Sequence, residues 1–121
     1  MNIKNFIKKT INDGGCTYSI NSGDINPSSG FAVAMEHREL IVNELGLTSD
    51  KLLRSYIDSN LDVLSSNNCY LGSWKSSHNG KDIYYLDCVE VIADRDDAIK
   101  CGLDNNQLAI YDLENEAEII L

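Results

Sequence analysis

The fold is decided by residues 69–93, CYLGSWKSSHNGKDIYYLDCVEVIA. Two runs that are rich in aromatic and β-branched residues, 69–75 and 82–93, flank a polar segment that contains Asn79-Gly80. Asn-Gly is the dipeptide most typical of a tight turn between antiparallel strands, because both residues tolerate a positive φ. The stretch therefore predicts a β-hairpin.

Upstream of this hairpin, the sequence predicts one helix and two strands. Apolar residues recur at helical spacing in residues 2–12, and Gly14-Gly15 follows as a helix stop. Residues 16–20 and 31–35 have the composition or the alternation of short strands. The polar stretch 21–30 contains Asn-Ser-Gly and Asn-Pro, which are turn signals, so we expect the two strands to form a hairpin with a long loop.

The segments on either side of the central hairpin predict further helices. Thr48-Ser49-Asp50 is an N-cap for a helix that runs to about residue 59, and Leu61 and Leu64 are compatible with another short turn. Residues 39–42 are compatible with a strand or with a connection. After the hairpin, the acids of residues 94–97 suit the start of a helix that ends near residue 104.

The last two predicted strands are residues 108–113 and 117–121. Taken together, these elements predict an α+β fold: an antiparallel sheet of about five to six strands, with an N-terminal helix and two further helices packed on one side. A length of 121 residues favours a single domain over residues 1–121.

The net negative charge of the chain comes entirely from its last third. Residues 1–81 contain eight acids and eight bases, whereas residues 82–121 contain eleven acids and two bases, so the net charge of −9 lies entirely in the second segment. A concentrated negative field repels nucleic acid and attracts basic protein surfaces. Direct nucleic-acid binding is therefore not expected. The N-terminus has no signal-peptide core and no apolar run is long enough to cross a membrane, which favours a cytosolic protein.

No motif in the sequence predicts catalysis, a cofactor or a metal. The two histidines, His37 and His78, lie in polar stretches outside any nucleophile motif, and we expect both at the surface. The four cysteines have no metal-ligand spacing and are typical of small buried side chains. The only tryptophan, Trp74, lies on a predicted strand, where a core position is expected rather than an exposed contact. The sequence therefore predicts a protein that is not an enzyme.

Acids at every second position form the strongest candidate binding feature. On one straight strand, the four carboxylates from residue 112 to residue 118 would line one face about 6.7 Å apart, a spacing that resembles the phosphates of a nucleic-acid backbone. A turn at residues 113–116 would instead split this row. The acids of residues 94–97 could add to the same field. The candidate partner-binding residues are Asp94, Asp96, Asp97, Asp112, Glu114, Glu116 and Glu118. Two interpretations remain open, a solvated acidic surface that keeps the protein soluble and a contact surface for a partner.

Two parts of the chain resemble a group of small proteins. Residues 12–19 (NDGGCTYS) with 29–33 (SGFAV), and residues 71–74 (LGSW) through 106–112 (NQLAIYD), are similar to proteins carried by phages, plasmids and integrative elements of Gram-positive bacteria. Some proteins of that kind are anti-CRISPR inhibitors or are encoded beside them. The resemblance implies a small acidic protein of the bacterial cytoplasm that inhibits an effector nuclease by binding it, and it carries over no catalytic residue.

The leading hypothesis combines the charge with the resemblance. It is a non-enzymatic counter-defence inhibitor whose acidic C-terminal face binds the basic nucleic-acid-binding surface of a CRISPR effector nuclease. The alternatives are an anti-restriction DNA mimic and an accessory protein-interaction domain of a mobile element with no nuclease target. The sequence leaves the oligomeric state open.

Overall fold

The computed structural model describes residues 3–23 and 27–121, and the central hairpin is its longest feature. Strand β4 (Cys69–His78) and strand β5 (Lys81–Ile92) pair over ten positions, from Cys69 opposite Glu90 to His78 opposite Lys81. The predicted hairpin is confirmed. Its strands reach the two-residue turn directly, because Asn79 and Gly80 both adopt positive φ values, 54° and 78°.

The remaining strands extend this hairpin into one antiparallel sheet with the order β1-β4-β5-β2-β6-β7. Strands β3 and β2 pair with the same edge of β5, one after the other. Residues 84–86 of β5 pair with β3, and residues 89–92 pair with β2. The bounds of the added strands are β1 Gly15–Tyr18, β2 Phe31–Ala34, β3 Leu40–Val42, β6 Ala109–Asp112 and β7 Ala117–Ile120. The described residues thus contain seven strands, and β3 is the segment for which the sequence left two possibilities.

The predicted pairing of residues 16–20 with residues 31–35 is wrong. Strand β1 pairs with β4, whereas β2 pairs with β5 and β6, so the whole central hairpin lies between them. Turn signals show where a chain reverses direction but do not fix which strand the returning segment joins. Residues 24–26 of the connection lie outside the described residues.

Five helices lie within the described residues, and local signals explain their ends. Helix α1 (Lys4–Asp13) stops where Gly14 adopts a φ of 89° and donates its backbone N–H to the carbonyl of Thr10. The Ser49 hydroxyl caps α3 (Asp50–Ser59) by accepting from the amide of Leu52. The other helices are α2 Glu44–Leu47, α4 Leu61–Leu64 and α5 Arg95–Asp104. Helix α2 was not expected from the sequence. No helix in the described part of the chain has the length and the apolar content needed to span a bilayer.

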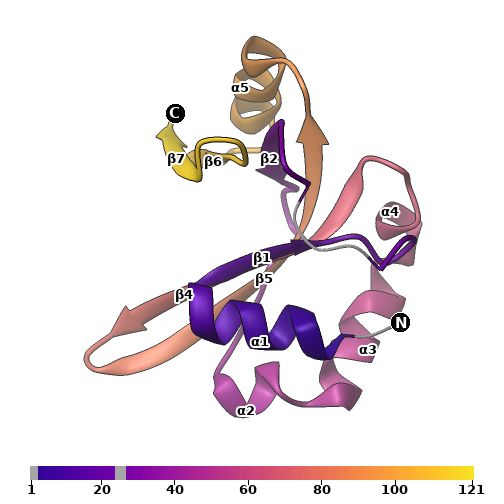
Figure 1. Ribbon diagram of the computed structural model, residues 1–121, viewed down its shortest axis with the longest axis vertical. Helices are drawn as coiled ribbons and strands as arrows, with labels where there is room; N and C mark the ends of the chain where they lie inside the picture. Colours follow the sequence, from indigo (N-terminus) through magenta and orange to yellow (C-terminus); the bar gives the residue numbers. More distant parts are fainter. Residues whose placement is uncertain (1–2, 24–26) are drawn as a thin grey trace.

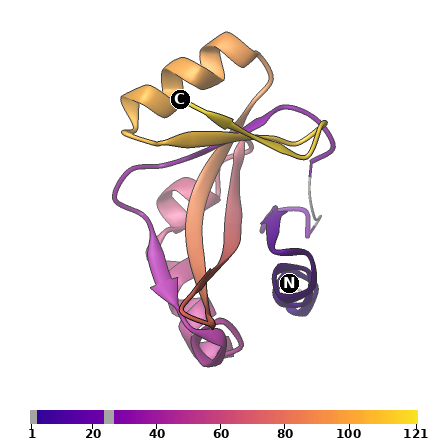
Figure 2. The same ribbon diagram turned by 90° about the vertical axis from the view of Figure 1, so that its left-hand side faces the viewer.

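The helices pack on one face of the sheet in two groups, as Figures 1 and 2 show. Helices α1 to α4 cover one end, where Phe6, Tyr18 and Leu71 belong to the larger core. Helix α5 covers the other end, where Ala98 packs with Val33 of β2 and Ile110 of β6 in a smaller core. Side chains alternate along each strand, so the residues between these core positions point to the opposite face. That face carries no helix among the described residues.

Candidate binding groove on the open face of the sheet

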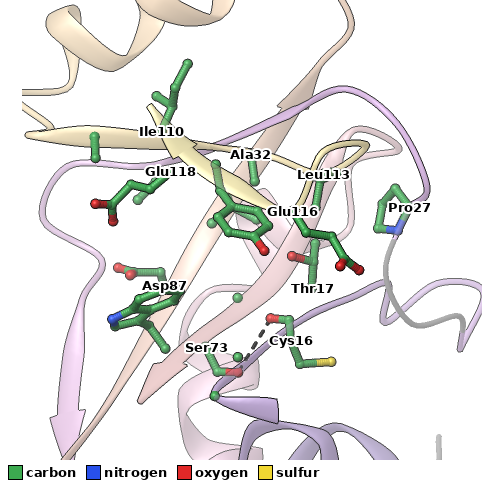
Figure 3. Close-up of a pocket in the computed structure, with 18 of the residues that line it drawn as sticks. Cys16, Thr17, Pro27, Ala32, Ser73, Asp87, Ile110, Leu113, Glu116 and Glu118 are labelled. Atoms are coloured by element: carbon green, nitrogen blue, oxygen red, sulfur yellow. Dashed lines mark hydrogen bonds between the residues drawn. The ribbon is translucent and has the colours of Figure 1, made fainter. Parts of the chain in front are cut away.

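The open face is hollowed into a groove of about 940 Å³. Strands β4, β5 and β2 form its floor, while β1 with the C-terminal part of α1 forms one side and the β6–β7 hairpin forms the other (Figure 3). The groove is deep because the residues in the middle of its floor carry at most a Cβ. These small floor residues are Gly72, Ala32 and Ala34.

Two aromatic rings meet above this floor. The ring centroids of Trp74 on β4 and Tyr111 on β6 lie 6.4 Å apart at an interplanar angle of 60°. In a flat sheet these strands would lie three strand spacings apart, about 14 Å, so the rings bridge the groove above β5 and β2. The groove therefore contains an aromatic corner built from both halves of the sheet.

The core position predicted for Trp74 is wrong. Its neighbours Leu71 and Ser73 point to the helical face, where Leu71 is buried and the Ser73 hydroxyl hydrogen-bonds that of Thr10 in α1. Alternation then directs Trp74 to the open face, where it is 48% exposed. Tyr84 and Tyr85 follow the same rule: Tyr84 is fully buried and Tyr85 is partly exposed.

An unpaired carboxylate lies on the floor of the groove. Asp87 of β5 is opposite Gly72 of β4, which has no side chain to cover it. Burial, and secondarily the nearby carboxylate of Glu39, raises the pKa of Asp87 to about 6. Within the described residues, no hydrogen bond or cation offsets this shift. The site thus holds an acid that lacks the partner a half-buried charge normally has.

The β6–β7 hairpin supplies three more acids to one side of the groove, but not as the straight row that the sequence suggested as one possibility. Residues 113–116 form the turn, and the Asp112 carboxylate serves that turn by accepting from the amides of Glu114 and Asn115. Asn115 also donates its side-chain amide to Asp112, and these bonds hold the pKa of Asp112 below its usual value. Asp112 is therefore a structural residue of the turn.

The other carboxylates of this hairpin are exposed and line the groove. Glu114 and Glu116 lie in the turn, and Glu118 lies on β7 opposite Tyr111. Figure 3 draws the carboxylates of Glu118 and Asp87 toward the left of the view, with Glu118 on the β6–β7 side of the groove and Asp87 on its floor. The structure thus separates the predicted row of four acids into two turn acids, Glu114 and Glu116, and two strand acids, Asp112 at the end of β6 and Glu118 on β7.

The acids of α5 lie at the same end of the sheet as the β6–β7 turn. Asp94 caps the helix by accepting from the amide of Asp97 at 2.9 Å, while Asp96 and Asp97 are exposed in its first turn. Phe31 of β2 pairs on one side with Ile92, just before the helix, and on the other with Asp112, just before the turn. This proximity joins the two acidic clusters into one surface, which we call the acidic end: Asp94, Asp96, Asp97, Asp112, Glu114 and Glu116.

The lysines that line the groove are already engaged. Lys9 forms an ion pair with Asp13 at 2.9 Å, and this bond, more than any other cause, raises the pKa of Lys9. Lys75 donates to the carbonyl of Ile11 and lies 3.7 Å from the Asp82 carboxylate. The groove lining has five acids and two lysines, so its formal charge is −3.

Among residues 3–23 and 27–121, the remaining titratable side chains form no second site. His37 and His78 are exposed, as predicted. All four cysteines are free thiols; Cys16 and Cys88 are buried, and Cys69 and Cys101 are partly exposed. No group of three or more His, Cys, Asp or Glu side chains in the described ranges could hold a metal ion.

Sequence reasoning missed the groove itself. Its residues Trp74, Asp87 and Tyr111 come from three strands that pair across the sheet. The alternation in residues 84–89 could have indicated part of the groove. Tyr84, Leu86 and Cys88 are buried on the helical face, so Asp87 lies on the opposite face. No protein-family model, curated protein or solved structure matches the chain.

Proposed function

We propose that this protein is a non-enzymatic inhibitor that binds the positively charged nucleic-acid-binding surface of a bacterial defence nuclease. The effector nuclease of a CRISPR system is the target that the resemblance of the sequence suggests. The observation that carries the proposal is the acidic end, where the acids of α5 and of the β6–β7 turn lie together with their carboxylates mostly exposed.

Electrostatics explains how such a surface would act. Effector nucleases hold the guide–target duplex in a positively charged channel and contact the neighbouring DNA with arginines. A folded protein that presents several carboxylates to this channel excludes nucleic acid from it by occupying the same cations. Long-range attraction also speeds the encounter, and it weakens as salt screens the charges.

Affinity capture followed by a competition assay tests the proposal. The tagged protein is incubated at low salt with a lysate from a bacterium that has CRISPR and restriction systems, and the bound nuclease is identified, purified and assayed for DNA binding. We expect the nuclease to be captured, to lose DNA binding when the protein is added, and to be released at moderate salt. Failure to capture any nucleic-acid-binding protein at low salt would contradict the proposal.

A pair of charge reversals locates the contact. Changing Glu114 and Glu116 to lysine should lower the association rate by roughly tenfold or more, because both carboxylates are exposed at the acidic end. The matched control changes Glu44 and Asp58, exposed acids of α2 and α3, to lysine and alters the net charge equally. Equal effects of the two pairs would mean that overall charge acts rather than this surface. Capture of a restriction enzyme in place of a CRISPR nuclease would favour the anti-restriction alternative.

A further inference from the structure

We propose that the groove on the open face binds an arginine side chain of the partner protein, with its guanidinium against the rings of Trp74 and Tyr111 and paired with the carboxylates of Asp87 and Glu118. The source of this arginine rests on the proposed function, since a nucleic-acid-binding surface is rich in arginine. The chemistry of the groove stands separately from that function.

The shape of the groove suits a flat group. Gly72 lies opposite Asp87, and a Cβ added at Gly72 would come within 2.9 Å of the Val89 side chain, so the floor beside the carboxylate is tight and low. Ala32 and Ala34 continue this low floor toward β6. The tilted rings of Trp74 and Tyr111 rise above it and present faces on which a planar cation can stack.

The groove has a net negative charge that the lysines of its own lining do not neutralise, so it favours a cation from outside the chain. Asp87 has no partner among the described residues, and Glu118 is an exposed acid on the β6–β7 side of the same groove. Lys9 and Lys75, the two lysines of the lining, are held by Asp13 and by Asp82 with the Ile11 carbonyl. An incoming cation would therefore meet carboxylates whose attraction is not already satisfied.

Arginine fits this combination better than lysine does. The guanidinium is planar, weakly hydrated and able to form two parallel hydrogen bonds with carboxylates, and it stacks on aromatic rings. An ammonium group is compact and strongly hydrated, so it loses more hydration free energy than a guanidinium does on entering a half-buried site. A nucleic acid would be repelled by the five acids of the lining, which excludes it as the occupant.

The single tryptophan makes the groove directly observable, because all indole fluorescence comes from Trp74. The probes are acetyl-Gly-Arg-Gly-amide, the corresponding lysine peptide, and a citrulline peptide that has the shape of arginine without its charge. We expect a saturable change in Trp74 emission with the arginine peptide, weaker binding of the lysine peptide and no binding of the citrulline peptide. No saturable change with arginine, or equal binding of citrulline, would overturn the proposal.

Two conservative variants test the carboxylates, and one control tests the background. We expect Asp87→Asn and Glu118→Gln each to weaken binding of the arginine peptide roughly tenfold, as loss of a charge-assisted hydrogen bond does. Glu118 is exposed, so Glu118→Gln tests the site without disturbing the floor. The control Asp58→Asn, on the exposed side of α3, should bind as the unmodified protein does. Unchanged binding by both groove variants would contradict the proposal.

The outcomes separate this inference from the proposed function. The pair Asp96→Lys and Asp97→Lys should weaken capture of the nuclease yet retain the arginine peptide, because these exposed acids belong to the acidic end but do not line the groove. If the peptide binds and no nuclease is captured, the proposed function fails and the groove assignment stands. If the nuclease binds Asp87→Asn and Glu118→Gln as tightly as the unmodified protein, the groove assignment fails alone. Emission that changes with protein concentration in the absence of peptide would indicate a second copy in the groove and would also overturn the assignment.

Discussion

At the scale of single residues, Asp87 is the side chain whose position is hardest to reconcile with stability alone. It lies on the longest strand of the sheet, between Leu86 and Cys88, which are both fully buried on the other face. Its carboxylate has no hydrogen bond from the described residues, and its pKa is raised to about 6. A half-buried charge without a partner destabilises the folded protein above that pH.

Replacing Asp87 by asparagine should therefore stabilise the protein at pH 7. Because the folded-state pKa is above the unfolded value, the folded protein binds the proton more tightly, and the penalty of ionisation is complete only above pH 6. Allowing for solvent screening, we expect Asp87→Asn to gain about 1–2 kcal/mol at pH 7. The gain should shrink as the pH falls through 6 and vanish near pH 4. Urea unfolding of both proteins at several pH values measures this difference, and a gain that is independent of pH would contradict it.

At the scale of elements, the two-residue turn of the central hairpin depends on the positive φ values of Asn79 and Gly80. Gly80 has a φ of 78°, and a Cβ at this position would meet no atom within 4 Å. Gly80→Ala should thus cost about 1 kcal/mol through the left-handed conformation, with no contribution from packing. The neighbouring exposed change Lys81→Ala is the control and should be near neutral. Chemical denaturation compares the two, and an equal effect of both variants would rule out the turn as the cause.

Gly102 in α5 represents the opposite case, in which packing outweighs backbone preference. A Cβ there would lie 2.6 Å from Leu121 and 2.8 Å from Ile110, a residue that is 2% exposed in the smaller core. Alanine would gain up to about 1 kcal/mol in helix propensity, but overpacking costs about 1–3 kcal/mol. We expect Gly102→Ala to lower the free energy of unfolding by about 1 kcal/mol. Lys100→Ala, on the exposed side of the same helix, should not lower it, and the melting temperatures of the two variants measure the difference.

The elements also show which parts of the structure the sequence could predict. Three local signals in the sequence correctly placed the boundaries of elements. Asn79-Gly80 forms the turn between β4 and β5, Gly14 ends α1, and Asp94 begins α5. The pairing of β1 with β4 and the outward position of Trp74 were missed, because both depend on contacts between distant segments. The acidic candidates were found by composition, whereas the groove beside them requires the register of four strands.

At the scale of the whole molecule, the two cores are unequal. The larger core joins four helices to the sheet, while the smaller one contains three buried residues, Val33, Ala98 and Ile110. Strand β5 passes through both regions, since it pairs with β3 near the larger core and with β2 near the smaller one. The end of the molecule that carries α5, β6 and β7 should therefore open at a lower free energy than the rest.

Truncating Ile110 tests this inequality. Ile110→Ala should cost about 2–5 kcal/mol of packing, and the cost should fall first on the smaller core that it occupies. Native-state hydrogen exchange should then show lower protection for the amides of α5, β6 and β7, with little change in those of α1 and α3. Leu53→Ala, in the larger core, is the comparison and should lower protection throughout the sheet. A uniform loss in Ile110→Ala would mean that the protein unfolds as one cooperative unit.

The reach of the β4–β5 hairpin has a practical consequence. Figure 1 shows its tip extending past the helices, and residues 77–82 are exposed and outside both cores. This tip does not line the groove, and it lies at the opposite end of β5 from the end that leads into α5. A fluorophore or a surface tether attached there would leave both candidate contact surfaces accessible. The hairpin tip is thus a suitable attachment site for immobilising the protein in the binding measurements described above.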